Sequence, residues 1–82
     1  MESPHDEREA NPKSRLQEWA AAAGRSAPAY RLVSRSGPDH APVFTVEVEV
    51  SGSPPSRADG ASRQAAEKAA ALALILREEG EA

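Results

Sequence analysis

Histidine and paired carboxylates are the first side chains to consider for catalysis or metal binding in this chain. The sequence has two histidines, His5 and His40, and no cysteine, so thiolate zinc sites and cysteine nucleophiles are excluded. Glu47 and Glu49 share one face of a predicted strand, but two carboxylates without a third ligand make a poor metal site. With so few histidines, a Ser-His-Asp arrangement also has little support. We therefore predict a non-catalytic chain with no metal and no cofactor.

His40 stands near the middle of a loop that is longer and stiffer than a hairpin requires. Six residues, Gly37 to Pro42, separate two predicted strands, whereas a tight hairpin needs only a pair such as Asn-Gly. The two prolines of the loop restrict its backbone before any partner arrives, which lowers the ordering cost of binding. The histidine can donate to or accept from a hydroxyl group. Because a lone loop histidine is usually just exposed, the loop predicts a contact only together with other features.

Alternating apolar and polar residues predict the strands that carry this loop. Between Phe44 and Val50 every second residue is apolar, which is typical of a half-buried antiparallel strand. A first strand is predicted from Tyr30 to Ser36. The Pro-Pro pair in SGSPPS (51–56) predicts a turn, and RADGA after it leaves room for a short third strand. One side of the first strand is expected to carry Tyr30 and Leu32, and the other side Arg31, Val33 and Arg35.

Two helices are predicted to flank the strands. Asn11 followed by Pro12 predicts a helix start, with asparagine as the N-cap and proline at the first helical position, and Gly24 predicts its end. Ser62 predicts the cap of a second helix that runs to the neighbourhood of Gly80. The order is α-β-β-β-α. This is an α+β fold, with both helices expected on one face of a three-stranded antiparallel sheet.

The second predicted helix contains an unbroken apolar stretch, residues 69–76. Leu72, Ile75 and Leu76 cannot all reach one small core, so at least one is predicted at the surface, where it could meet a partner. On the first helix, Trp19 lies one turn after a leucine and is predicted to point inward as a structural residue.

Charge divides the chain into acidic ends and a mildly basic middle. Residues 1–10 and 78–82 each carry a net charge of −3, whereas residues 11–77 carry +3 from nine basic and six acidic residues. The ends are predicted to be disordered, which gives an acidic N-terminal segment (1–10), one folded domain (11–78) and a C-terminal tail (79–82). A basic middle permits a polyanion partner. The chain has no signal-peptide pattern and no apolar run long enough to span a bilayer, so the cytoplasm is the expected compartment.

Four segments in this order resemble a double-stranded-RNA-binding domain: NPKSRLQEW, PAY, SGPDHAPVFTVEV and ADGASRQAAEKAAALAL. The resemblance covers about residues 11–78 and is greatest to the C-terminal domain of bacterial ribonuclease III. It implies the α-β-β-β-α fold and three regions that contact the 2′-hydroxyls and phosphates of duplex RNA. The residues that match these regions are Ser14, Gln17 and Glu18 in the first helix, Pro38, Asp39 and His40 in the loop, and Ser62, Arg63, Gln64 and Lys68 at the start of the second helix.

The chemistry of the matching residues suits such contacts. Ser14, Gln17 and Glu18 share one side of a helix at i, i+3 and i+4, and a glutamine both donates and accepts. Phosphates favour helix N-termini, where free N–H groups and the helix dipole point at them. Asp39 is unfavourable near phosphates and is expected to cap its turn instead.

The start of the second helix departs from the family pattern, which the resemblance gives as two consecutive basic residues after the serine, often with a third at the position of Glu67. Arg63 matches this pattern, whereas Gln64 and Glu67 do not. Lys68 restores one charge a residue later. The sequence therefore predicts a phosphate site of reduced charge.

Two functions remain open from the sequence. The first is binding of double-stranded RNA by its A-form shape, either as a domain of a ribonuclease III, whose endoribonuclease activity would lie in a separate domain, or as a free-standing protein of RNA processing. The alternative is a protein-interaction or dimerisation module with the same fold. In that case Leu72, Ile75 and Leu76 would provide the contact.

Overall fold

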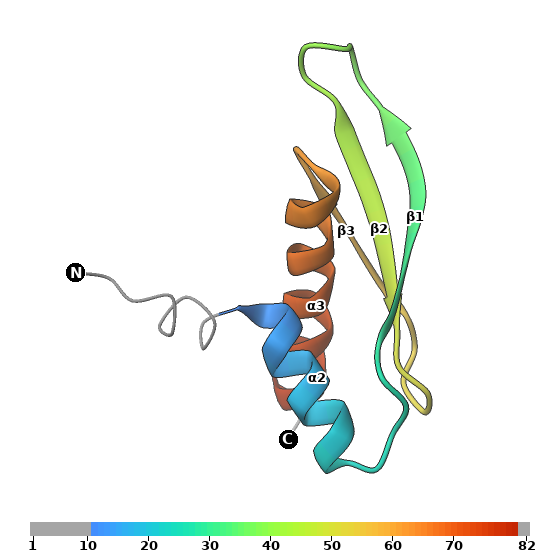
Figure 1. Ribbon diagram of the computed structural model, residues 1–82, viewed down its shortest axis with the longest axis vertical. Helices are drawn as coiled ribbons and strands as arrows, with labels where there is room; N and C mark the ends of the chain where they lie inside the picture. Colours follow the sequence, from blue (N-terminus) through green and yellow to red (C-terminus); the bar gives the residue numbers. More distant parts are fainter. Residues whose placement is uncertain (1–10, 81–82) are drawn as a thin grey trace, which may run out of the picture.

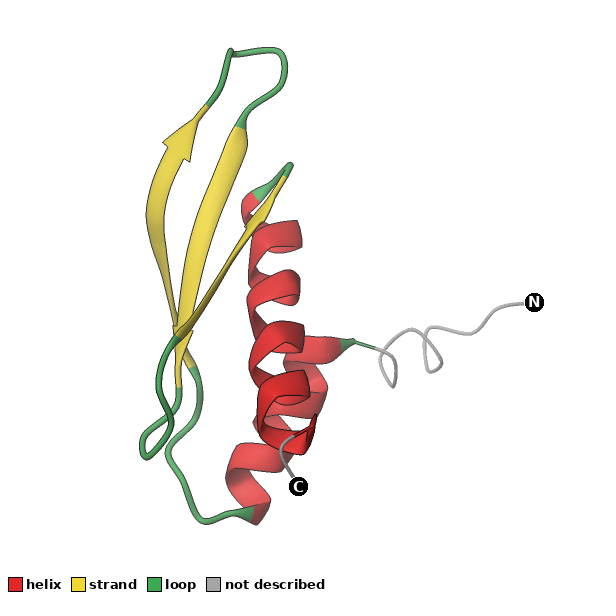
Figure 2. Cartoon of the chain, turned by 180° about the vertical axis from the view of Figure 1, so that it is seen from behind, coloured by secondary structure: helices red, strands yellow, loops and turns green. Residues whose placement is uncertain are grey.

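In the computed structural model, which describes residues 11–80, two helices cover one face of an antiparallel sheet (Figures 1 and 2). The sheet has the strand order β1-β2-β3. The elements are α2 (Pro12–Ala22), β1 (Ala29–Ser36), β2 (Val43–Glu49), β3 (Ser56–Gly60) and α3 (Arg63–Gly80). The predicted α-β-β-β-α fold is therefore confirmed. The predicted N-terminal segment, residues 1–10, lies outside the described residues.

Helix α2 begins and ends where the sequence predicts. The side chain of Asn11 accepts a hydrogen bond of 2.9 Å from the Lys13 N–H, which satisfies one of the free donors of the first turn. At the other end, the Arg25 N–H donates to the Ala20 carbonyl at 2.8 Å. The Gly24 N–H donates to the carbonyl three residues before it at 3.1 Å. These two bonds form a Schellman ending, which the positive φ of Gly24 allows.

A bulge in β1 changes which side chains face the helices. The pairing of β1 with β2 shifts between Leu32 and Ser34, so Val33 is an extra residue. After this point Arg35 pairs with Phe44, and its guanidinium lies 5.6 Å from the centre of the phenylalanine ring. One extra residue reverses the alternation of a strand. The prediction that Arg35 lies on the same side of β1 as Arg31 is therefore wrong.

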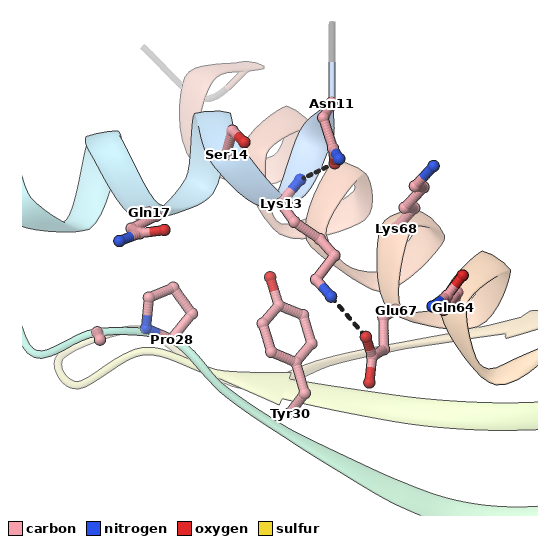
Figure 3. A pocket seen from close by; sticks show the side chains of 10 residues that line it. Asn11, Lys13, Ser14, Gln17, Pro28, Tyr30, Gln64, Glu67 and Lys68 are labelled. Carbon is pink, nitrogen blue, oxygen red and sulfur yellow. Dashed lines mark hydrogen bonds and ion pairs between the residues drawn. The ribbon is translucent and has the colours of Figure 1, made fainter. Parts of the chain in front are cut away.

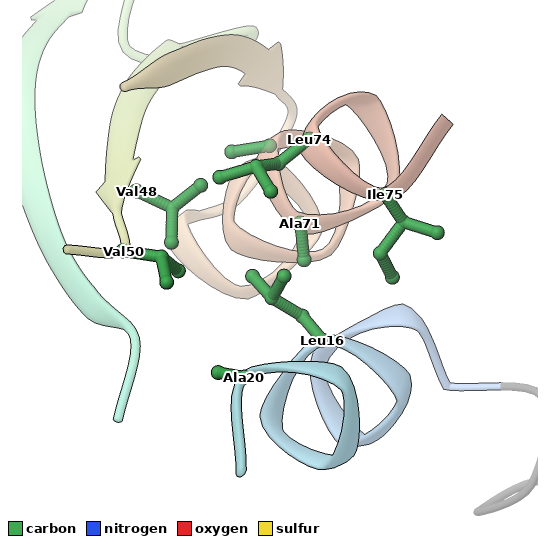
Figure 4. Packing of buried hydrophobic residues seen from close by; sticks show 8 residues of the cluster. Leu16, Ala20, Val48, Val50, Ala71, Leu74 and Ile75 are labelled. Carbon is green, nitrogen blue, oxygen red and sulfur yellow. The ribbon is translucent and has the colours of Figure 1, made fainter. Parts of the chain in front are cut away.

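The core is built from small and branched residues between the sheet and the helices (Figure 4). Trp19 of α2 is partly buried and packs against this core, so its predicted inward orientation is confirmed. Alanines on α3 bring that helix close to the sheet. The fully buried members of the cluster are Leu16, Ala20, Val48, Val50, Ala70, Ala71, Leu74 and Ile75.

Two arginines hold the turn between β2 and β3. Arg25 donates to the Ser53 hydroxyl at 2.6 Å, and its guanidinium lies 4.9 Å from the centre of the Trp19 ring. From the far end of α3, Arg77 donates to the Ser56 hydroxyl at 3.2 Å and to backbone carbonyls of the Pro-Pro pair. These two cations therefore stabilise the fold at this end of the sheet.

Helix α3 is capped by Ser62, whose hydroxyl accepts a hydrogen bond of 3.1 Å from the Ala65 N–H. The helix continues through Glu79 and Gly80, two residues that were predicted to belong to the C-terminal tail. Within residues 11–80, no helix has the length and apolar character needed to cross a membrane.

The apolar stretch of α3 divides between the core and the surface, as predicted. Ile75 is 2% exposed, whereas Leu72 and Leu76 are 37% and 57% exposed. Ile75 is therefore not available to a partner, and the prediction that it joins a contact surface is wrong. Its position on the helix turns it toward α2 and the core.

Candidate nucleic-acid interface

A groove with many polar side chains lies between the start of α2, the first two turns of α3 and the segment that leads into β1 (Figure 3). Ser14 and Gln17 line it from α2, and Gln64 and Lys68 line it from α3. Glu18 is exposed but does not line the groove. The fold therefore brings together predicted contact residues from two of the three regions. The remaining lining residues are Asn11, Lys13, Ala27, Pro28, Tyr30 and Glu67.

Lys13 and Glu67 also line the groove, although the sequence did not predict them at the interface. The Lys13 ammonium donates to Glu67 Oε1 at 2.6 Å and lies 5.1 Å from the centre of the Tyr30 ring. Glu67 Oε2 accepts a second hydrogen bond, of 3.2 Å, from Arg63 Nε. A signal for Lys13 was present in the sequence, because it precedes Gln17 by four residues and so shares its helix face.

These hydrogen bonds keep the Glu67 carboxylate ionised. The bond from Lys13 is the main cause of a lowered pKa of Glu67, and Arg63 adds to it, while partial burial opposes it. The groove therefore holds a permanent negative charge between two cations at neutral pH.

Tyr30 forms the floor of the groove and points its hydroxyl toward α2 (Figure 3). Burial, with a smaller contribution from Glu67, raises the pKa of Tyr30 to about 12, so the hydroxyl stays protonated. It has no hydrogen-bond partner among residues 11–80. The hydroxyl is therefore an unused donor beside the polar groups of the groove.

The start of α3 offers backbone donors beside Arg63. The Ala66 N–H donates to the Ser62 carbonyl at 2.9 Å, and the Ala65 N–H donates to the Ser62 hydroxyl. The N–H groups of Arg63 and Gln64 precede these two and have no carbonyl acceptor within the helix. They therefore remain available to an anion. Ser62 thus acts here as the helix cap, and Arg63 is more than half exposed, at 54% of its side chain.

The loop between β1 and β2 presents His40 at the tip of a turn. The Ala41 N–H donates to the Pro38 carbonyl at 3.0 Å, which places Asp39 and His40 at the two central positions. All four residues are exposed. A Cβ atom at Gly37 (φ 86) would lie 2.8 Å from the Ala41 carbonyl oxygen, so this turn requires glycine there.

The predicted cap by the Asp39 side chain is not observed. Among residues 11–80 the carboxylate of Asp39 accepts no hydrogen bond, and the backbone bond between Pro38 and Ala41 closes the turn instead. Figure 1 shows this loop at the end of the β1–β2 hairpin, beyond the start of α3. The loop and the groove are therefore two separate parts of the molecule.

The outer face of the sheet holds a different charge cluster. Glu47 accepts hydrogen bonds from Arg57 at 2.9 Å and from Arg31 at 3.2 Å, and these bonds, that from Arg57 first, lower the pKa of its carboxyl group. Within residues 11–80 no three His, Cys, Asp or Glu side chains are grouped so that they could hold a metal ion. The pairing of Glu47 with two arginines gives it a structural role across the three strands.

Comparison with known sequences identifies the family. The pattern of the family described as "Double-stranded RNA binding motif" matches residues 12–77. Ribonuclease 3 of Caulobacter vibrioides (strain NA1000 / CB15N) is 63% identical over 68 residues, which are 83% of this chain and 29% of the relative. Ribonuclease 3 of Phenylobacterium zucineum (strain HLK1) is 54% identical over 70 residues, 85% of this chain and 29% of that protein. The chain thus spans about 29% of the length of these curated relatives.

Solved structures agree with the sequence comparison. A structure of Arabidopsis HYL1, described in connection with miRNA processing, has a TM-score of 0.67 and 37% identity, and covers 84% of this chain and 96% of that chain. The solution structure of both dsRBDs of DRB4 has a TM-score of 0.69 and 30% identity, and covers 88% of this chain and 46% of that chain. The chain therefore belongs to the double-stranded RNA binding motif family and is a double-stranded-RNA-binding domain.

Proposed function

We propose that this domain recognises duplex RNA by its A-form shape through three contacts: the groove, the His40 loop and the N-terminus of α3. The observation that carries the proposal is the groove itself, where Ser14 and Gln17 meet Gln64 and Lys68. The loop, the start of α3 and the start of α2 follow one another along the long axis of the molecule (Figure 1). These three sites, in this order, fit a duplex that presents a minor groove, then a major groove and then a second minor groove.

Each contact has groups that fit one part of the RNA backbone. The amide of Gln17 and the hydroxyl of Ser14 can donate to and accept from ribose 2′-hydroxyls. His40 has the same capacity at the tip of its loop. Arg63, Lys68 and the free N–H groups of α3 suit phosphates. None of these groups depends on a particular base, so we expect recognition of shape with little sequence preference.

The second part of the proposal concerns the kind of protein in which this domain acts. The ribonuclease 3 relatives are about three times longer than the stretch they share with this chain, so we infer that the domain serves as the RNA-binding part of such a nuclease or as a free-standing binder. Cleavage of the RNA would then take place in another domain, and the protein would act in the cytoplasm.

The experiment that tests the proposal compares an RNA duplex with the DNA duplex of the same sequence. We expect tighter binding to RNA and a footprint near the ~16 bp that such domains span. Equal affinity for both duplexes would exclude readout of 2′-hydroxyls and A-form shape.

Two variants separate the loop from the helix terminus. His40→Ala should weaken binding by about 1 kcal/mol through a lost hydrogen bond, reduce the preference for RNA over DNA, and leave the salt dependence nearly unchanged. Arg63→Ala should weaken binding and reduce the slope of log affinity against log salt by about 1, because one phosphate contact is lost. Circular dichroism checks that both exposed substitutions preserve the fold. Parental affinity in both variants would show that the RNA surface lies elsewhere.

Self-association is a second candidate function, favoured by the exposure of Leu72 and Leu76 on α3. We infer that a second copy of the chain is the partner in this case. An antiparallel pair of α3 helices would place the leucines of the two copies together at the centre.

A further inference from the structure

Glu67 occupies a position where a negative charge opposes the proposed function. Its carboxylate lies in the groove between Lys13 (2.6 Å) and Arg63 (3.2 Å), and its side chain is 13% exposed. Figure 3 shows it facing Lys13 across the gap between α3 and α2. Lys13, which lines the groove, and Arg63, at the start of α3, are therefore both already bound to one carboxylate.

Both cations remain accessible from solvent in this arrangement. The side chains of Lys13 and Arg63 are 36% and 54% exposed. A phosphate could thus approach each of them without rearrangement of the backbone. A phosphate that binds either cation must approach the negative charge of the Glu67 carboxylate, which competes with it for the N–H donors of that cation.

We propose that Glu67 is an internal competitor for phosphate that lowers the affinity of this domain for duplex RNA, and that Lys13 is a phosphate ligand released from it on binding. This inference rests on the proposed function. Lys13 and Arg63 exchange the carboxylate for phosphate oxygens when RNA enters the groove. The free energy of the two ion pairs is then subtracted from the free energy of binding.

The ion pairs of Glu67 are not required to hold the helices together. Leu16 of α2 already packs in the same buried cluster as Ala71 and Ile75 of α3 (Figure 4). Ion pairs between partly exposed side chains contribute little to stability, because solvent screens them. The position of Glu67 is therefore explained better by a role in setting the charge of the groove than by a role in stabilising the fold.

The chain offers a closely matched control in Glu47. This glutamate also accepts hydrogen bonds from two cations, Arg31 (3.2 Å) and Arg57 (2.9 Å), and its side chain is 12% exposed. It lies on the outer face of the sheet, away from the helices and the groove. Glu67→Gln and Glu47→Gln change the net charge equally and break the same number of ion pairs. The two variants differ in the place from which the negative charge is removed.

The test is titration of a fluorescent RNA duplex with the parent and both variants at several salt concentrations. We expect Glu67→Gln to bind about fivefold more tightly at low salt, a gain within the range of two partly exposed ion pairs. Its slope of log affinity against log salt should stay close to that of the parent, because Lys13 and Arg63 neutralise the same phosphates in both proteins. Glu47→Gln should stay within about twofold of the parent, since its charge is distant and screened. Equal gains in the two variants would overturn the proposal in favour of net charge.

Lys13→Gln tests the ion pair between Lys13 and Glu67 from the side of α2. We expect it to weaken RNA binding and lower the salt slope by about 1, because a phosphate ligand is lost. If Glu67→Gln and Lys13→Gln weaken binding alike, Glu67 is a positioning residue and the proposal is wrong. Failure of the parent to prefer RNA over DNA would instead contradict the proposed function itself. A parent that prefers RNA, with no gain in Glu67→Gln, contradicts the competitor role alone.

Discussion

Gly60 and Ala66 approach each other so closely that no side chain fits between them. A Cβ atom at Gly60, the last residue of β3, would lie 2.4 Å from the backbone nitrogen of Ala66 in α3. Real Cβ atoms do not come so near to backbone. The glycine thus lets the end of the sheet contact the first turn of α3, the turn that carries Arg63.

Gly60→Ala should therefore destabilise the domain. We expect the free energy of unfolding to fall by about 1–3 kcal/mol, as for other overpacking substitutions, because α3 must shift away from β3. Urea denaturation followed by circular dichroism measures this change. Gly80→Ala is the control, since a Cβ atom there meets nothing within 4 Å. Equal stability of the two variants would show that the helix start adjusts without cost.

Trp19→Ala should lower the free energy of unfolding by about 3 kcal/mol, toward the lower end for large aromatic residues because the ring is only partly buried. The ring also supports Arg25, which holds the β2–β3 turn through Ser53. Thermal and urea denaturation of the parent and the variant measure the loss. A variant that stays as stable as the parent but no longer binds RNA would instead place the ring at the RNA surface.

The pH dependence of stability should reveal the ion pairs of Glu67. Because its pKa is lowered in the folded state, the group releases its proton more readily there than in the unfolded chain. Its contribution is fully present above the ordinary value of 4.5 and is lost as the pH falls through the lower, folded value. We expect the stability difference between the parent and Glu67→Gln to shrink below about pH 4.5. Urea denaturation between pH 7 and pH 3 measures it, and a constant difference across this range would contradict the assignment.

The leucines of α3 should control self-association. A single helix face buries less than the ~800 Å² per partner of a standard interface, so we expect a weak dimer that forms only at high protein concentration. The double variant Leu72→Gln/Leu76→Gln should remain monomeric in sedimentation equilibrium. Leu32→Gln is the control, because Leu32 is 38% exposed, close to the 37% of Leu72, but lies on β1. If the parent stays monomeric at the highest protein concentration, self-association is excluded as a function of this domain.

Much of the fold is determined locally and could be predicted from the sequence. The cap at Asn11, the ending at Gly24 and the alternation in β2 each depend on a few neighbouring residues. The family resemblance added the three contact regions. The structure brings two of these regions to one groove, because Lys13 near the start of α2 lies beside Glu67 in the second turn of α3.

The remaining features were decided by contacts between residues far apart in the chain. The bulge at Val33 depends on the register with β2, which no pattern within β1 reveals. It moved Arg35 to the face of Phe44. The pairing of Lys13 with Glu67 joins residues 54 positions apart. In the sequence Glu67 is a departure from a basic pattern, and only the packing of α2 against α3 places its charge between two cations.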